Sequence, residues 1–568
     1  MSFRQEKLKR VLHPDIKRCK VTKTSTGVRM NGPSARNLAI FLVVFLAAQA
    51  GLLLGQSNLL IDQHEGDALH LMQIAQRMAD GQWPHLDFMT PIGILAFAPI
   101  SWLLSLGAGA GHAMMGGMVL VAGLMLPAIW WVAFSRLSAA LGYFFAGFLI
   151  VMITSLVYGG DAVYASISMY YNRWTWAVAF LLVTLAVLPA ARHSQSADGL
   201  VLGLGLAFLA LSKITFFVAF LPGILLALVL RQQFRALLFG LIAGLTVVVI
   251  VTLIAGLDFW MAYLGDLRAI SGSGIRAHPG AFLPQLLIGA PYVGANLCLA
   301  SGIVFLRQSG KSTEGLLLIF FAPAFIYVTY QNWGNDPKWL ILLAVLLFSL
   351  RPDRHVNNAF GWDVGRCMAI VSLVSAVLYL PSLYALSTAN IRHAGMDSEG
   401  YVQVFPDHKK QDVGMRLDRM YATTKRAPFT LSDPMIRARA ASAFDLPADD
   451  LFGQPLALCK LHMGLVGMLH QMAADVEKLD GISGKSIFVA DTFSNLWLFG
   501  STVAVPGASP WYYGINPGYL KADYLLVPLC PVTPAARSQV LAELPDSGLN
   551  FDEVARTDLF ILLRILPD

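Results

Sequence analysis

Uncharged apolar runs of about 20 residues recur along the first two thirds of the chain. As a helix, each run is long enough to cross the roughly 30 Å hydrocarbon core of a bilayer. The runs stop near Leu386, so we predict a polytopic α-helical membrane protein with about eleven spans and a separate C-terminal domain. The predicted spans are residues 37–60, 113–134, 138–157, 174–190, 199–212, 214–230, 236–256, 283–305, 315–331, 337–350 and 367–387.

A polar stretch, Leu59–Gly93, interrupts this pattern directly after the first span. Apolar residues at helical spacing predict an amphipathic surface helix over residues 67–80, which Gly81 ends. The alternative interpretation is an ordinary polar loop between two spans. The stretch is rich in ionisable groups for a chain that is only 13% charged: Asp62, Glu65, Asp67, Asp80, Asp87, His64, His70 and His85.

The next apolar segment, Pro91–Leu106, is only marginally long enough to span. If it does not cross, nine basic residues of the later short loops lie on the same side as the basic N-terminus, as the positive-inside rule favours. We therefore predict an interfacial or re-entrant helix here, within an outer loop at residues 61–112. The C-terminus then lies outside.

Residues 199–230 form one apolar run with Lys213 near its middle. We interpret the run as a tight hairpin with Lys213 at the outer surface. The alternative is a single long tilted helix whose lysine extends toward the interface.

Residues 389–568 change character, because their apolar residues are mixed with 16 Lys/Arg and 20 Asp/Glu. The pattern predicts a soluble α/β domain with a helix at Leu461–Leu479 and buried strands at 486–490, 524–528 and 559–563. It contains no nucleotide-binding loop, metal quartet or nucleophile elbow. Cys459 and Cys530 would be able to pair if this domain is extracytoplasmic.

Composition excludes a single soluble globule, since 56% of the 568 residues are hydrophobic and the mean hydropathy is +0.60. The net charge of +6 comes largely from residues 1–37, which hold ten Lys/Arg against two acids. A nucleic-acid interaction would explain such a basic start. We prefer a cytoplasmic tail that follows the positive-inside rule, and we predict no nucleic-acid partner.

Cations on the outer face run against the topological bias, so we expect some of them to bind a phosphate at the membrane surface. The alternative interpretation for each of these cations is an ion pair with a neighbouring acid. The motif at residues 170–176 mixes aromatic residues with an arginine just before a span, as an aromatic belt or a lipid-phosphate sugar site would. The phosphate-site candidates are Arg173, Lys213, Arg268, Arg276 and Lys338.

Glu65 and Asp67 fall at the start of the predicted surface helix, where acids also cap a helix and complement its dipole. A carboxylate would nevertheless suffice as a general base for sugar transfer. The acceptor hydroxyl loses its proton only as it attacks, and the phosphate leaves readily if its charge is compensated.

The arrangement resembles the C-type membrane glycosyltransferases, especially the branch with protein O-mannosyltransferases and the lipid A aminoarabinose transferase. The resemblance lies in an acidic motif after the first span, a surface helix that ends in a Gly-aromatic step, and a Pro-led second surface helix. It is sharp over residues 60–106, and Lys213 matches the lysine between two spans of that family. This chain departs from the family at His64, where the motif usually has Asp. The matching segments are His64–Asp67, Met78–Pro84 and Asp87–Gly93.

The resemblance implies an inverting transfer from a polyprenyl-phosphate sugar to an envelope glycan, lipid or protein on the extracytoplasmic face. The base would be Glu65, Asp67 or Asp62, and these remain unranked. We expect His64, His85, Asp87, Tyr171 and Asn172 to line the substrate site. We predict no specific cofactor, and the sequence does not decide whether the reaction uses a divalent cation.

Two other functions compete with this one. A transporter of lipid-linked sugars would place charges inside its spans, whereas this chain keeps nearly all of them at span ends. A non-catalytic envelope glycan assembly protein would act through the C-terminal domain. Compact loops favour a bacterial protein of the inner membrane, with the N-terminus cytoplasmic and residues 389–568 periplasmic.

Overall fold

Helices joined by loops make up most of the chain between Ala35 and Ala394. The computed structural model describes residues 32–275, 281–332, 335–406, 412–425, 434–435, 449–457, 459–515 and 518–566, so nearly all of the predicted basic tail lies outside the described residues. The helices of this part are α2 (Ala35–Leu54), α3 (Glu65–Ala79), η1 (Ile94–Ala96), α4 (Ala98–Ser105), α5 (Ala110–Arg136), α6 (Ala139–Thr154), α7 (Tyr170–Val187), α8 (Gln195–Ser212), α9 (Ile214–Leu230), α10 (Phe234–Ala255), α11 (Asp258–Ser271), α12 (Leu283–Ile288), α13 (Ala290–Gln308), α14 (Ser312–Gln331), α15 (Trp339–Ser349), α16 (Val364–Leu378) and α17 (Leu380–Ala394).

Among the described residues, six helices are long and apolar enough to cross a membrane: α2, α5, α8, α10, α13 and α14. A seventh candidate is the pair α16 and α17, which are bent by 53° at Tyr379. The helices α6, α9 and α15 are apolar but shorter. The fold is therefore mostly helical with six or seven candidate spans.

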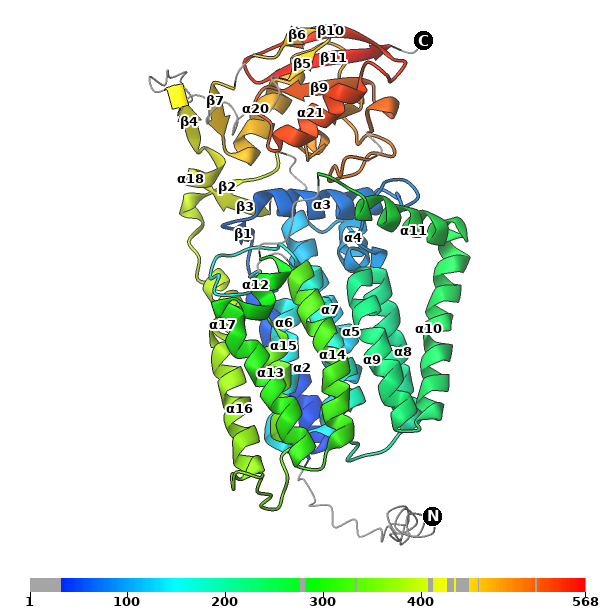
Figure 1. Cartoon of the computed structure of the whole chain (residues 1–568). Coiled ribbons are helices and arrows are strands. Elements are labelled where there is room, and N and C mark those ends of the chain that lie inside the picture. The colour runs from blue at the N-terminus through cyan, green and yellow to red at the C-terminus, as the bar shows by residue number, and fades with distance from the viewer. Residues whose placement is uncertain are drawn as a thin grey trace, which may run out of the picture. The chain divides into compact units, whose positions relative to one another are not determined.

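Two amphipathic helices, α3 and α11, lie across the ends of the long helices rather than parallel to them (Figure 1). The helix predicted over residues 67–80 is thus confirmed as α3, although it begins two residues earlier. The segment Pro91–Leu106 forms only the turn η1 and the eight-residue helix α4, which is about 12 Å long and too short to span. The sequence pattern did not predict α11.

The apolar run at residues 199–230 breaks at Lys213. Helix α8 ends at Ser212 and α9 begins at Ile214, because Lys213 itself has extended backbone angles (φ −149°, ψ 99°). The predicted hairpin is confirmed, and the single long helix was the wrong alternative.

Packing differs greatly between the helices. Almost every residue of α7 is buried, including Trp174 and Trp176, so α7 runs through the middle of the helical core. In contrast, only 6% of the apolar window of α10 is buried. Helix α10 contacts α8 closely because Gly203 leaves room for the backbone of Gly240, where a Cβ would come within 2.1 Å of the carbonyl oxygen.

The C-terminal region contains small mixed sheets and short helices. In one sheet, β8 pairs in parallel with β9, and β9, β11 and β10 follow in antiparallel order. The strands of the whole chain are β1 (Leu59–Ile61), β2 (Tyr401–Gln403), β3 (Val413–Arg416), β4 (Thr423–Lys425), β5 (Asp450–Leu451), β6 (Gln454–Pro455), β7 (Leu461–Met463), β8 (Ile487–Val489), β9 (Tyr524–Pro528), β10 (Asn550–Arg556) and β11 (Phe560–Leu566). The helices of this region are η2 (Ser398–Gly400), α18 (Leu417–Met420), α20 (Leu465–Val476), η4 (Leu496–Phe499), η5 (Gly518–Lys521) and α21 (Pro534–Glu543).

The three predicted strands of this region are confirmed as β8, β9 and β11 within a few residues. The helix predicted over Leu461–Leu479 was partly wrong, because Leu461–Met463 forms β7 and the helix α20 starts at Leu465. The cysteines Cys459 and Cys530 form a disulfide.

A three-stranded sheet joins the segment after α2 to the C-terminal region. Strand β1, which follows α2, pairs in parallel with β3, and β3 pairs with β2. The register places Leu59 opposite Val413 and Ile61 opposite Met415. The acidic motif therefore begins at the edge of a sheet that residues far away in the sequence complete.

Candidate functional site

The acidic motif is bound to one short segment, residues 165–168, which precedes α7. The Asp62 carboxylate accepts a hydrogen bond from the backbone N–H of Ala165 at 2.9 Å. The His64 ring lies 2.9 Å from the Ser166 hydroxyl, and the Ser168 hydroxyl donates to the Asp67 carboxylate. Three residues of the motif thus share a single anchor at the N-terminus of α7.

Asp62 is fully engaged in this anchoring. It is 9% exposed, and its second oxygen accepts a hydrogen bond from the Tyr401 hydroxyl at 2.5 Å. Its backbone N–H also donates to the carbonyl of Ala165. These contacts fix Asp62 as a structural link between the outer loop and β2.

Glu65 lies at the first position of α3 and is held by an arginine of the C-terminal region. The Arg419 guanidinium, on α18, reaches both Glu65 oxygens at 2.8 Å. The ion pair therefore occupies both carboxylate oxygens of Glu65 with a protein partner.

Asp67 has a different environment from the other two acids. Burial raises the pKa of its carboxyl above the ordinary value, although the Ser168 hydrogen bond and the charge of His64 act in the opposite direction. Among the described residues, only its Oδ2 atom has a hydrogen-bond partner. Asp67 therefore combines a raised pKa with one carboxylate oxygen that accepts no hydrogen bond from the described residues.

Lys213 is brought to the same end of α7. Its ammonium group donates to the Asn172 side-chain oxygen at 2.6 Å and to that of Asn332 at 2.8 Å. The ring of Tyr171 lies 5.7 Å away, within the range of a cation–π contact. The predicted lining residues Tyr171 and Asn172 thus surround the lysine that sits at the α8–α9 break.

The other predicted phosphate-site cations are placed differently. Arg173 is completely buried and donates to the carbonyls of Ser155 (2.5 Å) and Ser168 (3.4 Å), so it holds the segment before α7 in place. Lys338 forms an ion pair with Asp336 at 2.6 Å. Arg268 is exposed on α11, and Arg276 lies outside the described residues.

The predicted lining residues His85 and Asp87 stabilise the loop after α3. The His85 ring binds the carboxylate of Asp266, on α11, at 2.8 Å, and Asp266 also accepts from the backbone N–H of Thr90. Asp87 accepts a hydrogen bond from the backbone N–H of Trp83 at 2.6 Å. His85 therefore connects the loop to α11, whereas Asp87 closes a turn within the loop.

A loop of the C-terminal region, residues 505–511, covers the opposite end of α3. Arg77 donates to the carbonyls of Val505 and Ala508, and Gln73 donates to that of Pro510. Burial lowers the pKa of Arg77 to about 10. Sequence reasoning missed this contact, although the single arginine of this amphipathic helix was a signal for it.

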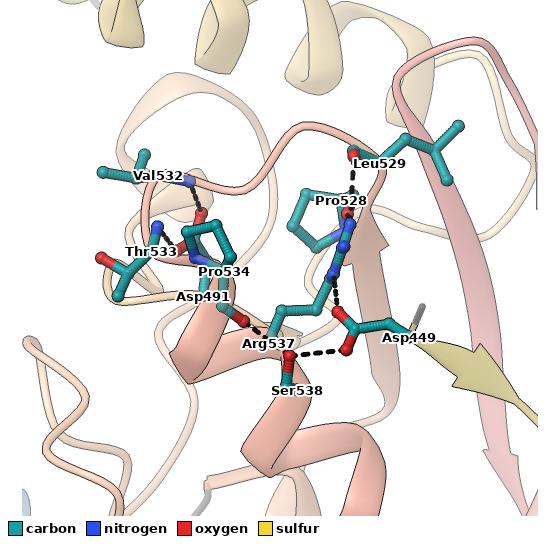
Figure 2. Close-up of polar contacts among 9 residues, drawn as sticks. All are labelled: Asp449, Asp491, Pro528, Leu529, Val532, Thr533, Pro534, Arg537 and Ser538. Carbon is teal, nitrogen blue, oxygen red and sulfur yellow. Dashed lines mark hydrogen bonds and ion pairs between the residues drawn. The ribbon is translucent and has the colours of Figure 1, made fainter. Parts of the chain in front are cut away.

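The C-terminal region contains one more buried carboxyl group with a shifted pKa (Figure 2). Burial raises the pKa of Asp491 to about 6, while its oxygens accept hydrogen bonds from the backbone N–H groups of Thr492, Val532 and Thr533. Arg537 nearby is paired with Asp449 at 2.6 Å. All of these groups are satisfied by protein atoms, so we interpret the cluster as the support that ties α21 to the end of β8.

Within the described part of the chain, no three His, Cys, Asp or Glu side chains gather as a metal site would require. No protein-family model matches the chain, and neither a curated protein nor a solved structure matches it. The function must therefore be argued from the arrangement of the site itself.

Proposed function

We propose that this protein is an integral-membrane glycosyltransferase that transfers a sugar from a polyprenyl-phosphate donor to an envelope acceptor. The observation that carries the proposal is the convergence of Asp67 and Lys213 on the N-terminus of α7. Asp67 binds Ser168 and Lys213 binds Asn172, four residues further on. A base and a cation that are both held at the end of one buried helix suit a displacement at a sugar phosphate.

Asp67 is the preferred base among the three acids. In the proposed reaction an acceptor hydroxyl attacks the anomeric carbon, the bond from that carbon to the phosphate oxygen breaks, and the acceptor proton passes to Asp67. The configuration at the anomeric carbon is inverted, because attack and departure occur on opposite faces. Asp62 and Glu65 are each occupied by protein partners that favour a structural role.

Lys213 is the preferred phosphate-binding residue. Its ammonium would stabilise the negative charge that develops as polyprenyl phosphate leaves. The side-chain oxygens of Asn172 and Asn332 accept hydrogen bonds from the ammonium and orient it. Arg173 would support this position indirectly, through the segment that it anchors.

The proposed topology has eleven crossings. The seven candidate spans are joined by α6, α9 and α15, which are apolar but short, and by the buried helix α7. An odd number of crossings places the basic N-terminus and the C-terminal region on opposite sides. The Cys459–Cys530 disulfide favours an oxidising compartment for the latter, as in the periplasm of a bacterial cell.

Mass spectrometry of envelope glycolipids and polysaccharides would test this proposal. The comparison needs the wild-type strain, a deletion strain, and the deletion strain complemented with the wild-type gene, with Asp67→Asn or with Asp80→Asn. We expect one sugar to disappear in the deletion and to return with the wild-type and Asp80→Asn genes only. Asp80 is a matched control, because it is an exposed aspartate that follows directly after the last residue of the same helix. An unchanged glycan profile in the deletion strain would contradict the proposed function.

A further inference from the structure

A groove of about 640 Å³ lies on the C-terminal region, beside strands β2 and β3, which pair with each other in the sheet that contains β1. Its described lining residues are Gly400, Tyr401, Arg416, Leu417, Asp418 and Tyr421. The volume lies within the range of sites that bind small molecules. The elements that form the groove are β2, β3 and α18.

The lining of the groove combines apolar and polar groups. Leu417 and Tyr421 are 49% and 53% exposed, which is high for large side chains of this kind. Arg416 and Asp418 bind each other through two hydrogen bonds, at 2.6 and 3.0 Å. The pair offers donors and acceptors side by side while its charges cancel.

This combination suits a carbohydrate better than a phosphate. The face of a tyrosine ring packs against the C–H groups of a sugar, and a carboxylate and a guanidinium bind its hydroxyl groups. A phosphate would have to compete with Asp418 for the guanidinium of Arg416. The groove therefore favours an uncharged, hydroxyl-rich ligand.

The same elements hold two of the three acids. Tyr401, in the wall of the groove, donates to Asp62, and Arg419, on α18, binds Glu65. Strand β3, which contributes Arg416, pairs with β1 directly before the acidic motif. A ligand in the groove would thus lie against the elements that position α3.

We propose that this groove, termed the Tyr421 groove, binds the carbohydrate portion of the acceptor. The inference rests on the proposed function, to which it adds the chemical class of the acceptor. Glycan binding in the groove would hold the acceptor against the elements that bind Asp62 and Glu65, on the side of the chain where α3 begins.

Binding would be measured on the purified full-length protein in detergent. The probes are oligosaccharides released by mild acid from the envelope glycolipids of the source strain, observed by saturation-transfer NMR, with inorganic phosphate as a competitor. We expect Tyr421→Ala and Asp418→Asn to weaken binding about tenfold, Tyr421→Trp to retain it, and phosphate not to compete. Asp475→Asn is the matched control, because Asp475 forms a similar ion pair with Lys478 in a second groove of the same volume.

Unchanged binding in both Tyr421→Ala and Asp418→Asn would overturn the proposal, as would competition by millimolar phosphate or binding of a peptide acceptor in place of the oligosaccharide. A Tm equal to that of the wild type in Tyr421→Ala and Asp418→Asn excludes misfolding as the cause of a loss, and retained binding by Tyr421→Trp shows that the aromatic ring is what the ligand needs. The test separates this inference from the proposed function. Binding that depends on Tyr421 without any sugar transfer would leave the groove assigned and remove the enzyme activity. Sugar transfer in which Tyr421→Ala leaves the acceptor KM unchanged would support the enzyme activity and contradict the role of the groove.

Discussion

Replacing Asp67 by asparagine separates a catalytic role of this residue from a structural one. The asparagine oxygen can accept the hydrogen bond that Ser168 donates to Asp67, so the link between α3 and the N-terminus of α7 is kept. The change removes the base, and loss of a general base typically slows a reaction by about 10²- to 10⁴-fold. We expect kcat to fall by that factor while the KM for the donor stays within about threefold.

The same substitution, Asp67→Asn, is expected to lower kcat but not the thermal stability of the protein. Burial raises the pKa of Asp67, so the folded protein favours the protonated form more than the unfolded chain does. The contribution of this carboxyl to stability then falls as the pH rises from its ordinary pKa through its folded-state pKa, and it stays low above that. Asp67→Asn removes a buried charge, and at pH 7 the variant should have a Tm equal to or above that of the wild type.

The assay is transfer of radiolabelled sugar from a polyprenyl-phosphate donor in proteoliposomes, measured from pH 4 to pH 8. Activity of the wild type should decline on the acid side at a higher pH than an ordinary aspartate would cause, and the decline should be absent from the residual rate of Asp67→Asn. Asp80→Asn serves as the control. A rate for Asp67→Asn within threefold of the wild-type rate, or a Tm several degrees lower, would refute the reasoning.

Three further predictions follow from the contacts described above. Lys213→Ala should lower kcat by about 10²-fold and raise the donor KM, whereas Lys213→Arg should recover part of both, as steady-state kinetics would reveal. Arg419→Ala leaves Glu65 partly buried without its partner and should cost about 1–2 kcal/mol, seen as a lower Tm, while the loss with Arg419→Lys should be smaller. Replacing Cys459 and Cys530 by serine should lower the free energy of unfolding of the C-terminal region by up to about 4 kcal/mol, because the disulfide closes a loop of 71 residues. Limited proteolysis with and without a reductant would measure the last effect, and resistance unchanged by reduction would contradict it.

The sequence pattern predicted the helices well because apolar runs near 20 residues have few other stable structures. It also located the break at Lys213, since a 32-residue apolar run is too long for one span. It failed to predict α11, which is only 14 residues long and lies in a stretch between two predicted spans that we treated as a loop. The pattern also missed β1–β3, because strands of three or four residues carry too little periodicity to be recognised.

The candidate site was predicted in part. The acids and Lys213 stood out by their position, yet nothing in the sequence ranked Asp62, Glu65 and Asp67. Their ranking depends on Tyr401 and Arg419, which lie more than 330 residues further along the chain. Partners this distant cannot be inferred from local spacing. Nor did position reveal that Arg173 is enclosed by backbone carbonyls rather than directed at a substrate.

The pairing of β1 with β3 also determines when, during synthesis of the chain, the segment around α3 can finish folding. The link between Glu65 and Arg419 spans 354 residues. At a synthesis rate of about 5–20 residues per second, the outer loop would wait roughly 20–70 s for its partner strand to be made. During that interval the edge of β1 is open, and α3 lacks the contacts that position it. In a ribosome-bound chain, Asp62 and Glu65 would therefore lack their partners Tyr401 and Arg419 until the C-terminal region has emerged. Truncating that region would yield a membrane protein that inserts but in which β1, Asp62 and Glu65 lack their partners from the C-terminal region.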